Sequence, residues 1–370
     1  MLPKGKPVRM DFIKKYLFAR AGIKFWVALT ILIATIYFAT SNGWWVGLFW
    51  DNSVYYRAVE DYLSGADAYR NEQPPFLPFV YHPYVLWAFA AIHSGVHLWY
   101  ALVCAMFASA AYAGYLLFRS AGLSTREFLT AVTIAFTLKF FALTSFASGN
   151  LVVTLNFLIF GTCLHYLRQR GQYLSWLPAV LIVFGALVKP YLLAYLFLAL
   201  LDRRPLLRSI AMISAGVAFS VVAWLSAYLV LPDQMRNLTG NLYDLQSTTR
   251  MDLGWSLFSI VYHLVGSNLA ALSIHCVVMG ALAIWLLRAL LHARDEGTAR
   301  PVMILVLGWL MLTLVNPRMK DYDIGPALLF LAPIVWPISP RFRAVTTGYV
   351  TMLLVPLMIL IVTALMGISL

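Results

Sequence analysis

Charged residues are scarce in this sequence, and no stretch of it has the composition of a soluble domain. Asp, Glu, Lys and Arg together make up 11% of the 370 residues, and hydrophobic residues make up 62%. A soluble domain has about 25% charged residues. Because no water-soluble core of this length hides so much apolar surface, we expect lipid to surround most of the chain. This excludes a secreted enzyme, a cytosolic dehydrogenase and a nucleic-acid-binding module.

Cysteine and glycine-rich motifs are also missing where particular functions require them. The three cysteines, Cys104, Cys163 and Cys276, lie in apolar stretches without a CxxC spacing. They therefore predict neither a disulfide framework nor a cysteine metal site. There is no glycine-rich phosphate loop and no soluble nucleotide-binding domain, and no cofactor is required by the pattern.

Long apolar windows recur from end to end and predict an all-α polytopic membrane protein. We expect about 11 transmembrane helices in a single domain, residues 1–370. A further segment, 79–94, is predicted to be a re-entrant or interfacial helix on the outer face, because a crossing there would reverse the loops that follow. The predicted spans lie near 24–46, 97–118, 128–148, 151–167, 174–188, 190–201, 207–231, 268–291, 301–316, 325–338 and 345–368.

The distribution of charge predicts the orientation of these spans. With the N-terminus in the cytoplasm, most of the 27 basic residues fall in inner loops, and most of the 15 acidic residues fall in outer loops. This is the positive-inside pattern, so the basic net charge needs no nucleic acid to explain it. The prediction is a multi-pass protein of a bacterial cytoplasmic membrane, with outer loops 47–96 and 232–267 on the periplasmic or extracellular face.

Asp51 is the strongest candidate for a catalytic residue. It follows the run 44–50, which contains three tryptophans, where the first span leaves the bilayer. Burial among such rings raises the pKa of a carboxylate and suits it to accept a proton. The residues that follow, including Tyr55 and Tyr56, have helical spacing typical of an amphipathic helix on the membrane. The alternative is an aromatic interface belt that happens to precede an aspartate.

Lys189 is a second candidate, because a lysine at bilayer level normally faces a cavity and an anionic partner. It precedes Pro190, and proline removes a backbone donor, so we predict a break between two helices here. A lipid phosphate would meet the ammonium group at this break. The alternatives are a lysine that extends to the interface, and one long helix kinked at Pro190.

The segment 316–323, between two late apolar spans, holds two cations and two carboxylates. Arg318 and Lys320 suit a phosphate or diphosphate. Asp321 and Asp323 are candidates for substrate contacts or for a divalent cation, although an isolated D-x-D pair is a weak signal. A salt-bridged turn between helices explains the same residues.

Weaker candidates for substrate contacts lie elsewhere on the outer face. Asn150 belongs to a tight Ser-Gly-Asn turn whose amide suits a hydroxyl-rich ligand. His82 is a donor for a phosphate or sugar, or equally a buried structural imidazole. Tyr55, Tyr81 and Arg250 complete this set.

Taken in order, these residues resemble the GT-C integral-membrane glycosyltransferases, and within them glycosyltransferase family 87, the polyprenyl-phosphate-mannose-dependent α-mannosyltransferases. The late loop departs from that pattern, because Lys320 and Asp321 stand where the family continues to an aromatic residue and histidine. The matching positions are Asp51 with Tyr55, Gly65, Tyr69, Tyr81 and Pro83; Gly149-Asn150 with Asn156; Lys189-Pro190; and Asn316-Pro317-Arg318.

The resemblance implies a GT-C-like fold and transfer of one sugar, mannose or similar, from a polyprenyl-phosphate donor to a lipid or glycan acceptor. Asp51 would act as general base, and Lys189, Arg318 and Lys320 would hold the leaving lipid phosphate. Two alternatives stay open: a transporter or flippase of lipid-linked sugars, and a glycan polymerase or ligase that uses diphosphate-linked donors.

Overall fold

The computed structural model describes residues 49–69, 78–121, 148–170, 174–202, 205–247 and 257–296, together with Leu305 and Gly308. Every regular element in this part of the chain is a helix. The elements are α3 (Trp50–Leu63), α4 (Pro83–Gly95), α5 (Leu98–Ala121), α8 (Leu151–Arg170), α9 (Trp176–Val188), the 3₁₀ helix η1 (Pro190–Leu201), α10 (Leu206–Val230), α11 (Pro232–Ser247), α12 (Leu257–Val265) and α13 (Asn268–Glu296).

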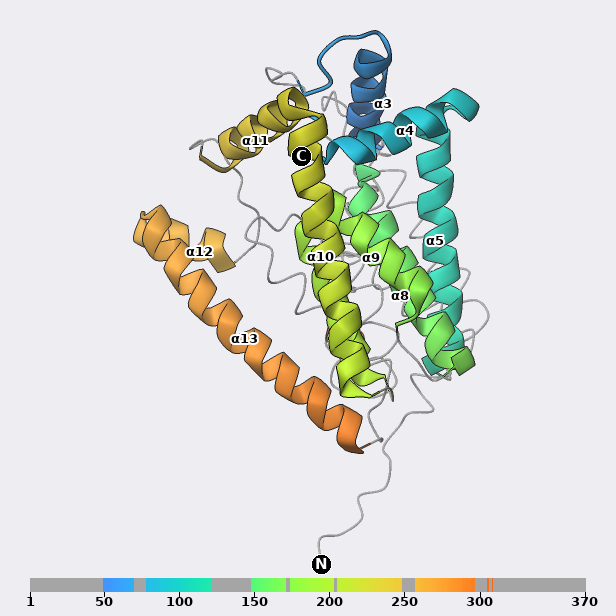
Figure 1. The fold of residues 1–370 in the computed structure, drawn as a ribbon, viewed down its shortest axis with the longest axis vertical. Helices are drawn as coiled ribbons and strands as arrows, with labels where there is room; N and C mark the ends of the chain where they lie inside the picture. The colour runs from blue at the N-terminus through green and yellow to red at the C-terminus, as the bar shows by residue number, and fades with distance from the viewer. Residues whose placement is uncertain are drawn as a thin grey trace, which may run out of the picture.

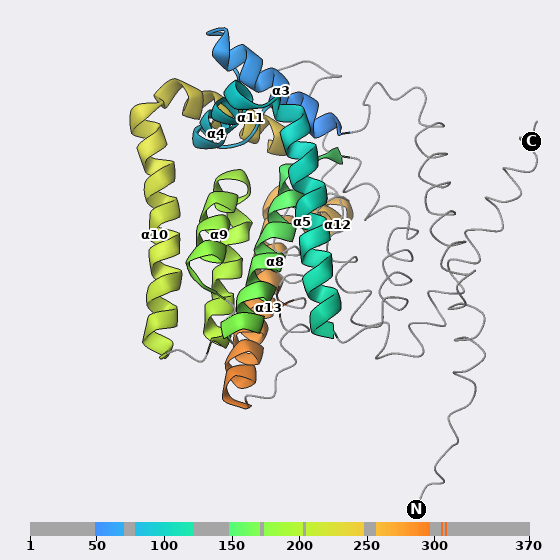
Figure 2. The same ribbon diagram turned by 90° about the vertical axis from the view of Figure 1, so that its right-hand side faces the viewer.

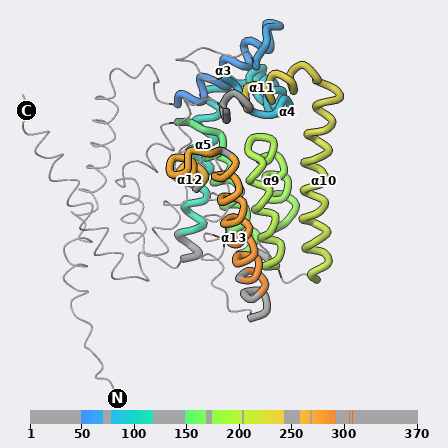
Figure 3. The backbone as a smooth tube through the Cα atoms, turned by 90° about the vertical axis from the view of Figure 1, so that its left-hand side faces the viewer, coloured from blue at the N-terminus to red at the C-terminus, as the bar shows by residue number. Residues whose placement is uncertain are grey.

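The helices form an upright bundle with a smaller layer at one end. Helices α5, α8, α9, η1 and α10 run along the long axis, and α3, α4 and α11 gather at one end of them (Figures 1 and 2). We call this layer of α3, α4 and α11 the cap. Helix α13 packs against η1 on the side of the bundle that faces the viewer in Figure 3.

Within the described ranges, three helices are long and apolar enough to cross a membrane. These segments, Leu98–Leu117, Leu206–Val230 and Leu269–Arg288, coincide with the predicted spans 97–118, 207–231 and 268–291. Large apolar side chains such as Phe219 and Val277 are exposed on them, as lipid-facing positions require. The all-α class is confirmed for the described residues, in which these three helices are candidate membrane spans, and the number of about 11 spans stays a prediction.

Shorter apolar helices fill the centre of the bundle. Leu151–Leu167, Trp176–Val188 and Pro190–Leu201 match the predicted segments 151–167, 174–188 and 190–201. The other predicted spans lie outside the described residues almost throughout: 24–46, 128–148, 301–316, 325–338 and 345–368.

The chain breaks at Lys189, as the sequence predicts, and the alternative of one helix kinked at Pro190 is wrong. Lys189 has extended backbone angles (φ −140°, ψ 108°) between α9 and η1. The two helices then fold back against each other, as Figure 2 shows. They meet closely at Gly185, where a Cβ atom would lie 2.9 Å from the side chain of Leu192.

The cap contains the two segments that were expected at the outer face. Helix α4 has 13 residues, about 20 Å at 1.5 Å per residue, and lies across the ends of the bundle helices (Figure 1). Helix α3 begins at Trp50, and its apolar face is not turned to lipid as expected for a helix lying on a membrane. Tyr55, Ala58 and Val59 are instead buried in the protein core.

Candidate functional site

The first turn of α3 positions Asp51. Phe49, directly before the helix, has left-handed backbone angles (φ 62°, ψ 43°), the one such non-glycine residue in the described part of the chain. Asp51 is 8% exposed and lies at the end of the helix where the backbone N–H groups point outward. This end carries partial positive charge, which stabilises the carboxylate form.

Asn150, in the turn before the bundle helix α8, holds the Asp51 carboxylate. Its Nδ2 donates a hydrogen bond of 2.7 Å to Oδ2 of Asp51, across 99 residues of sequence. Its Oδ1 accepts from the backbone N–H of Val152 (2.9 Å) and from the hydroxyl of Tyr81 (3.3 Å). The structure therefore brings together two predicted site residues, and both donor and acceptor of the Asn150 amide are used within the protein.

Two tyrosines extend this contact into a chain of hydrogen bonds. The hydroxyl oxygens of Tyr55 and Tyr81 lie 2.8 Å apart, and the Tyr55 hydroxyl accepts from the backbone N–H of Leu151 at 3.2 Å. Because Tyr81 donates to Asn150, its oxygen is left to accept from Tyr55. The chain thus runs from Leu151 through Tyr55, Tyr81 and Asn150 to Asp51, and it fixes the direction of each donor.

Burial keeps the Tyr55 hydroxyl neutral. Loss of hydration raises the pKa of Tyr55 well above its usual value of 10, and the neighbouring Tyr81 and Asp51 raise it further. Burial raises the pKa of Tyr69 as well. The Tyr69 hydroxyl donates to the Tyr81 carbonyl at 2.8 Å. The tyrosines at this site are therefore hydrogen-bond donors that position Asp51 and Asn150, and not bases.

The turn before α8 lies directly against the start of α3. Gly149 has a positive φ of 67°, and a Cβ atom there would lie 3.0 Å from both Oδ1 of Asn52 and Cβ of Phe49. The Ser148 hydroxyl accepts from the backbone N–H of Asn150 at 3.1 Å and so closes the turn. Only glycine adopts this geometry without strain, which explains why residue 149 is a glycine.

His82 connects the cap to the bundle. Its backbone N–H donates to the carbonyl of Leu187 at 3.1 Å, two residues before Lys189. Its Nδ1 accepts from the backbone N–H of Tyr84 at 3.2 Å and caps α4. The side chain is fully buried, and burial lowers its pKa to about 4. These contacts fit the buried structural imidazole better than a ligand-facing donor.

The remaining predicted site residues divide into one that is described and five that are not. Lys189 is half-buried at the α9–η1 break, and the His82–Leu187 bond places this break next to the cap. No group of three His, Cys, Asp or Glu side chains suited to a metal ion occurs within the described ranges. The other five predicted residues lie outside these ranges: Arg250, Arg318, Lys320, Asp321 and Asp323. The candidate divalent-cation site at Asp321 and Asp323 therefore also lies outside the described residues.

The sequence reasoning missed the contribution of α11 to this region. Asn241 Nδ2 donates to the Tyr69 carbonyl at 2.7 Å, and Asn237 Nδ2 donates to Oδ2 of Asp67 at 2.9 Å. Both asparagines therefore hold the segment that follows α3. Their i, i+4 spacing on a polar helix was a signal that two amides share one face. Asn52 is also buried, with 1% of its surface exposed, but no pattern in the sequence predicts its burial.

Comparison of the chain with protein-family models, with curated proteins and with solved structures finds no match. The case for a function therefore depends on the residues and on their geometry.

Proposed function

We propose that the chain is a membrane glycosyltransferase that moves a single sugar, mannose or a similar hexose, from a polyprenyl-phosphate donor to a lipid or glycan acceptor. The observation that carries this proposal is the Asp51–Asn150 hydrogen bond of 2.7 Å between the cap and the turn before α8. It joins a carboxylate and an amide from distant segments, at the end of the bundle to which the acidic loops were assigned.

Asp51 has the chemistry of a general base in this transfer. The acceptor hydroxyl oxygen would attack the anomeric carbon while its proton passes to the Asp51 carboxylate. The bond between the anomeric carbon and the phosphate oxygen would break, and the polyprenyl phosphate would leave with that electron pair. Asn150 and the tyrosine chain behind it would keep the carboxylate oxygen in place during the attack.

Lys189 would stabilise the phosphate that leaves. The α9–η1 break that contains it lies next to the cap, and a cation there would offset the charge that develops on the lipid phosphate. Arg318 and Lys320 are proposed as further phosphate ligands, in a chain of about 11 spans. The cap would lie at the outer face of a bacterial cytoplasmic membrane, so that the polyprenyl tail reaches lipid between apolar helices.

The test uses the purified chain in lipid nanodiscs with a radiolabelled polyprenyl-phosphate mannose and a membrane extract as the source of acceptor. Asp51→Asn is expected to abolish donor consumption, since an amide does not accept the proton. The matched control is Asp233→Asn, which removes an exposed carboxylate of the cap that pairs with Arg236 at 3.7 Å and is expected to retain full activity. Full activity in Asp51→Asn would refute the assignment.

The same experiment separates a transferase from a transporter of lipid-linked sugars. A transporter needs broken helices and buried polar groups in the bundle, and the chain has both, including a 2.9 Å hydrogen bond from Tyr195 to Asn156. Transport of the labelled lipid across a proteoliposome membrane without transfer, unaffected by Asp51→Asn, would favour that function.

A further inference from the structure

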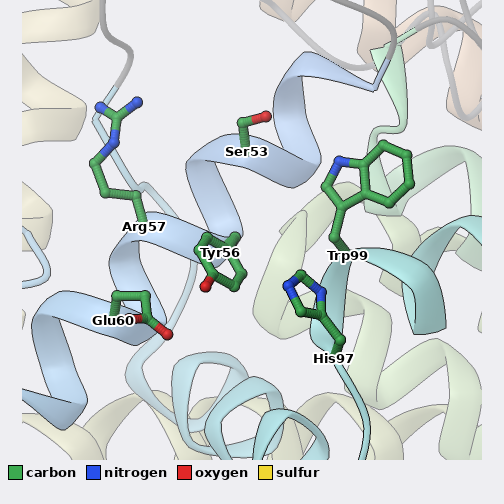
Figure 4. A pocket seen from close by; sticks show the side chains of 6 residues that line it. All are labelled: Ser53, Tyr56, Arg57, Glu60, His97 and Trp99. Atoms are coloured by element: carbon green, nitrogen blue, oxygen red, sulfur yellow. The ribbon is translucent and has the colours of Figure 1, made fainter.

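A groove lies on the face of α3 that is opposite to Asp51. Asp51 and Tyr55 are buried on the side of α3 that faces the protein. Four other residues of this helix lie on roughly the opposite side of its axis: Ser53, Tyr56, Arg57 and Glu60. Figure 4 shows Tyr56 beside His97, the residue before α5, with Trp99 from the first turn of α5 next to it. The six residues line an open groove of about 350 Å³, a volume within the range of small-molecule sites.

Three of the six residues that line this groove, Tyr56, His97 and Trp99, have aromatic side chains. Tyr56 and His97 stack with ring centroids 5.0 Å apart and planes within 9° of parallel. Trp99 is held edge-on by Phe49, with centroids 5.5 Å apart, and by Tyr100. Because these contacts fix the rings before any ligand arrives, they offer apolar surface at a low entropic cost.

The other three lining residues are polar, and two of them carry opposite charges. Ser53 supplies a hydroxyl, Arg57 a guanidinium and Glu60 a carboxylate, and Glu60 also lies 3.1 Å from Nε2 of His93. An anionic ligand would be repelled by Glu60, and a cationic ligand by Arg57. Donors and acceptors in balanced charge beside flat apolar rings suit a neutral polyhydroxylated ring, whose C–H face stacks while its hydroxyls form hydrogen bonds.

We infer that this groove binds a neutral carbohydrate chain. Ser53 and Glu60 are seven residues apart on one helix face, about 10 Å, which accommodates roughly two pyranose rings. The chain would be the part of the acceptor remote from the reacting hydroxyl, and this last step rests on the proposed transferase function. Binding itself does not, since it is measured without donor or turnover.

The experiment measures binding of three neutral trisaccharides, α-mannotriose, maltotriose and chitotriose, to the full chain in nanodiscs by saturation-transfer NMR and calorimetry. At least one is expected to bind, and Trp99→Ala and Tyr56→Ala are each expected to weaken it about tenfold. Trp87→Ala, which removes a tryptophan of α4 that is 37% exposed and outside the groove, is the matched control and should bind normally.

Several outcomes would overturn the inference. These are no binding of any trisaccharide at millimolar concentration, equal binding by wild type and both groove variants, and displacement of the trisaccharide by glycerophosphocholine at lower concentration. The last result would assign the groove to a lipid headgroup. Because Trp99 contacts Phe49, its replacement could disturb the start of α3, so the circular dichroism spectrum of Trp99→Ala must match that of wild type. Glu60→Gln is a second, isosteric groove variant, and its affinity for the trisaccharide is expected to be weaker than that of wild type.

The results for the groove and for catalysis are independent. Trisaccharide binding that survives in Asp51→Asn supports the groove whether or not the chain transfers sugar. Transfer without trisaccharide binding would leave the proposed function standing and refute the groove. Loss of trisaccharide binding in Asp51→Asn would place the sugar at Asp51 and likewise refute it.

Discussion

Replacing Asn150 with alanine tests whether the Asp51 contact organises the cap. The change removes the donor to Asp51 Oδ2 and the acceptor for the Val152 N–H, and both partners are buried. A hydrogen bond to an ionised group contributes about 1.5–3 kcal/mol, and an unsatisfied buried donor costs about 1–3 kcal/mol. Water that enters the vacated space recovers part of this, so we expect a net loss of about 3 kcal/mol.

The chain provides a matched control in Asn237 of the cap helix α11. Asn237 also donates from Nδ2 to an aspartate Oδ2, at 2.9 Å, but this pair with Asp67 is exposed. Water replaces the lost donor there, so Asn237→Ala should cost about 0.5 kcal/mol or less. Both variants remove an amide donor to an aspartate Oδ2. They differ in the burial of that carboxylate and in the acceptor that Asn150 also supplies to the Val152 N–H and the Tyr81 hydroxyl.

Unfolding in nanodiscs, followed by helical circular dichroism, measures the difference. At about 2 °C per kcal/mol, Asn150→Ala should lower Tm by roughly 6 °C and Asn237→Ala by roughly 1 °C. In a double-mutant cycle with Asp51→Ala, we expect a coupling free energy of at least about 1 kcal/mol between the two residues. Equal Tm values for both asparagine variants, together with an additive cycle, would refute the reasoning.

Two further perturbations follow from the same region. Gly149→Ala places a Cβ atom 3.0 Å from Asn52 Oδ1 and Phe49 Cβ, at a residue whose φ is positive. We therefore expect Tm to fall by several degrees and donor consumption to be reduced. A Tm equal to that of wild type would contradict this tight turn. Burial lowers the pKa of His82 to about 4 in the folded chain, whereas an imidazole in the unfolded chain has a pKa of about 6.5. Between these two pH values only the unfolded chain binds a proton at His82. The free energy of unfolding therefore falls by at most about 3 kcal/mol as the pH drops from about 6.5 to 4. His82→Asn keeps an acceptor for the Tyr84 N–H and should flatten this acid limb in Tm measured against pH; an unchanged pH dependence would exclude His82 as its source.

Local features of the fold could be predicted because they depend on short stretches of sequence. The apolar length of residues 207–231 is sufficient to predict α10, and the helical spacing of the residues after Asp51 predicts α3. The break at Pro190 follows from the missing backbone donor. In each case the physical cause lies within a few turns of the residue concerned.

The contacts within the site could not be predicted in the same way. Nothing local to Asn150 indicates that its amide donates to Asp51, 99 residues earlier, because that contact depends on how α8 and α3 approach each other. Likewise, the periodicity of α3 predicts an apolar face but does not say whether protein or lipid covers it. The groove at Tyr56 and Trp99 forms only when α5 lies beside α3.

Phe49 links the two faces of α3. Its left-handed conformation is costly for a bulky residue, by about 1–3 kcal/mol, and persists only where surrounding contacts enforce it. On one side its Cβ meets the Gly149 turn that carries Asn150, and on the other its ring packs edge-on against Trp99 of the groove. The residue that precedes α3 is therefore held by both sites at once. Phe49 thus contacts Trp99 of the groove and also the turn that carries Asn150. Because one residue contacts both, the groove and the Asp51 carboxylate keep a fixed spacing, and a sugar chain stacked on Trp99 would lie next to the Phe49 side chain.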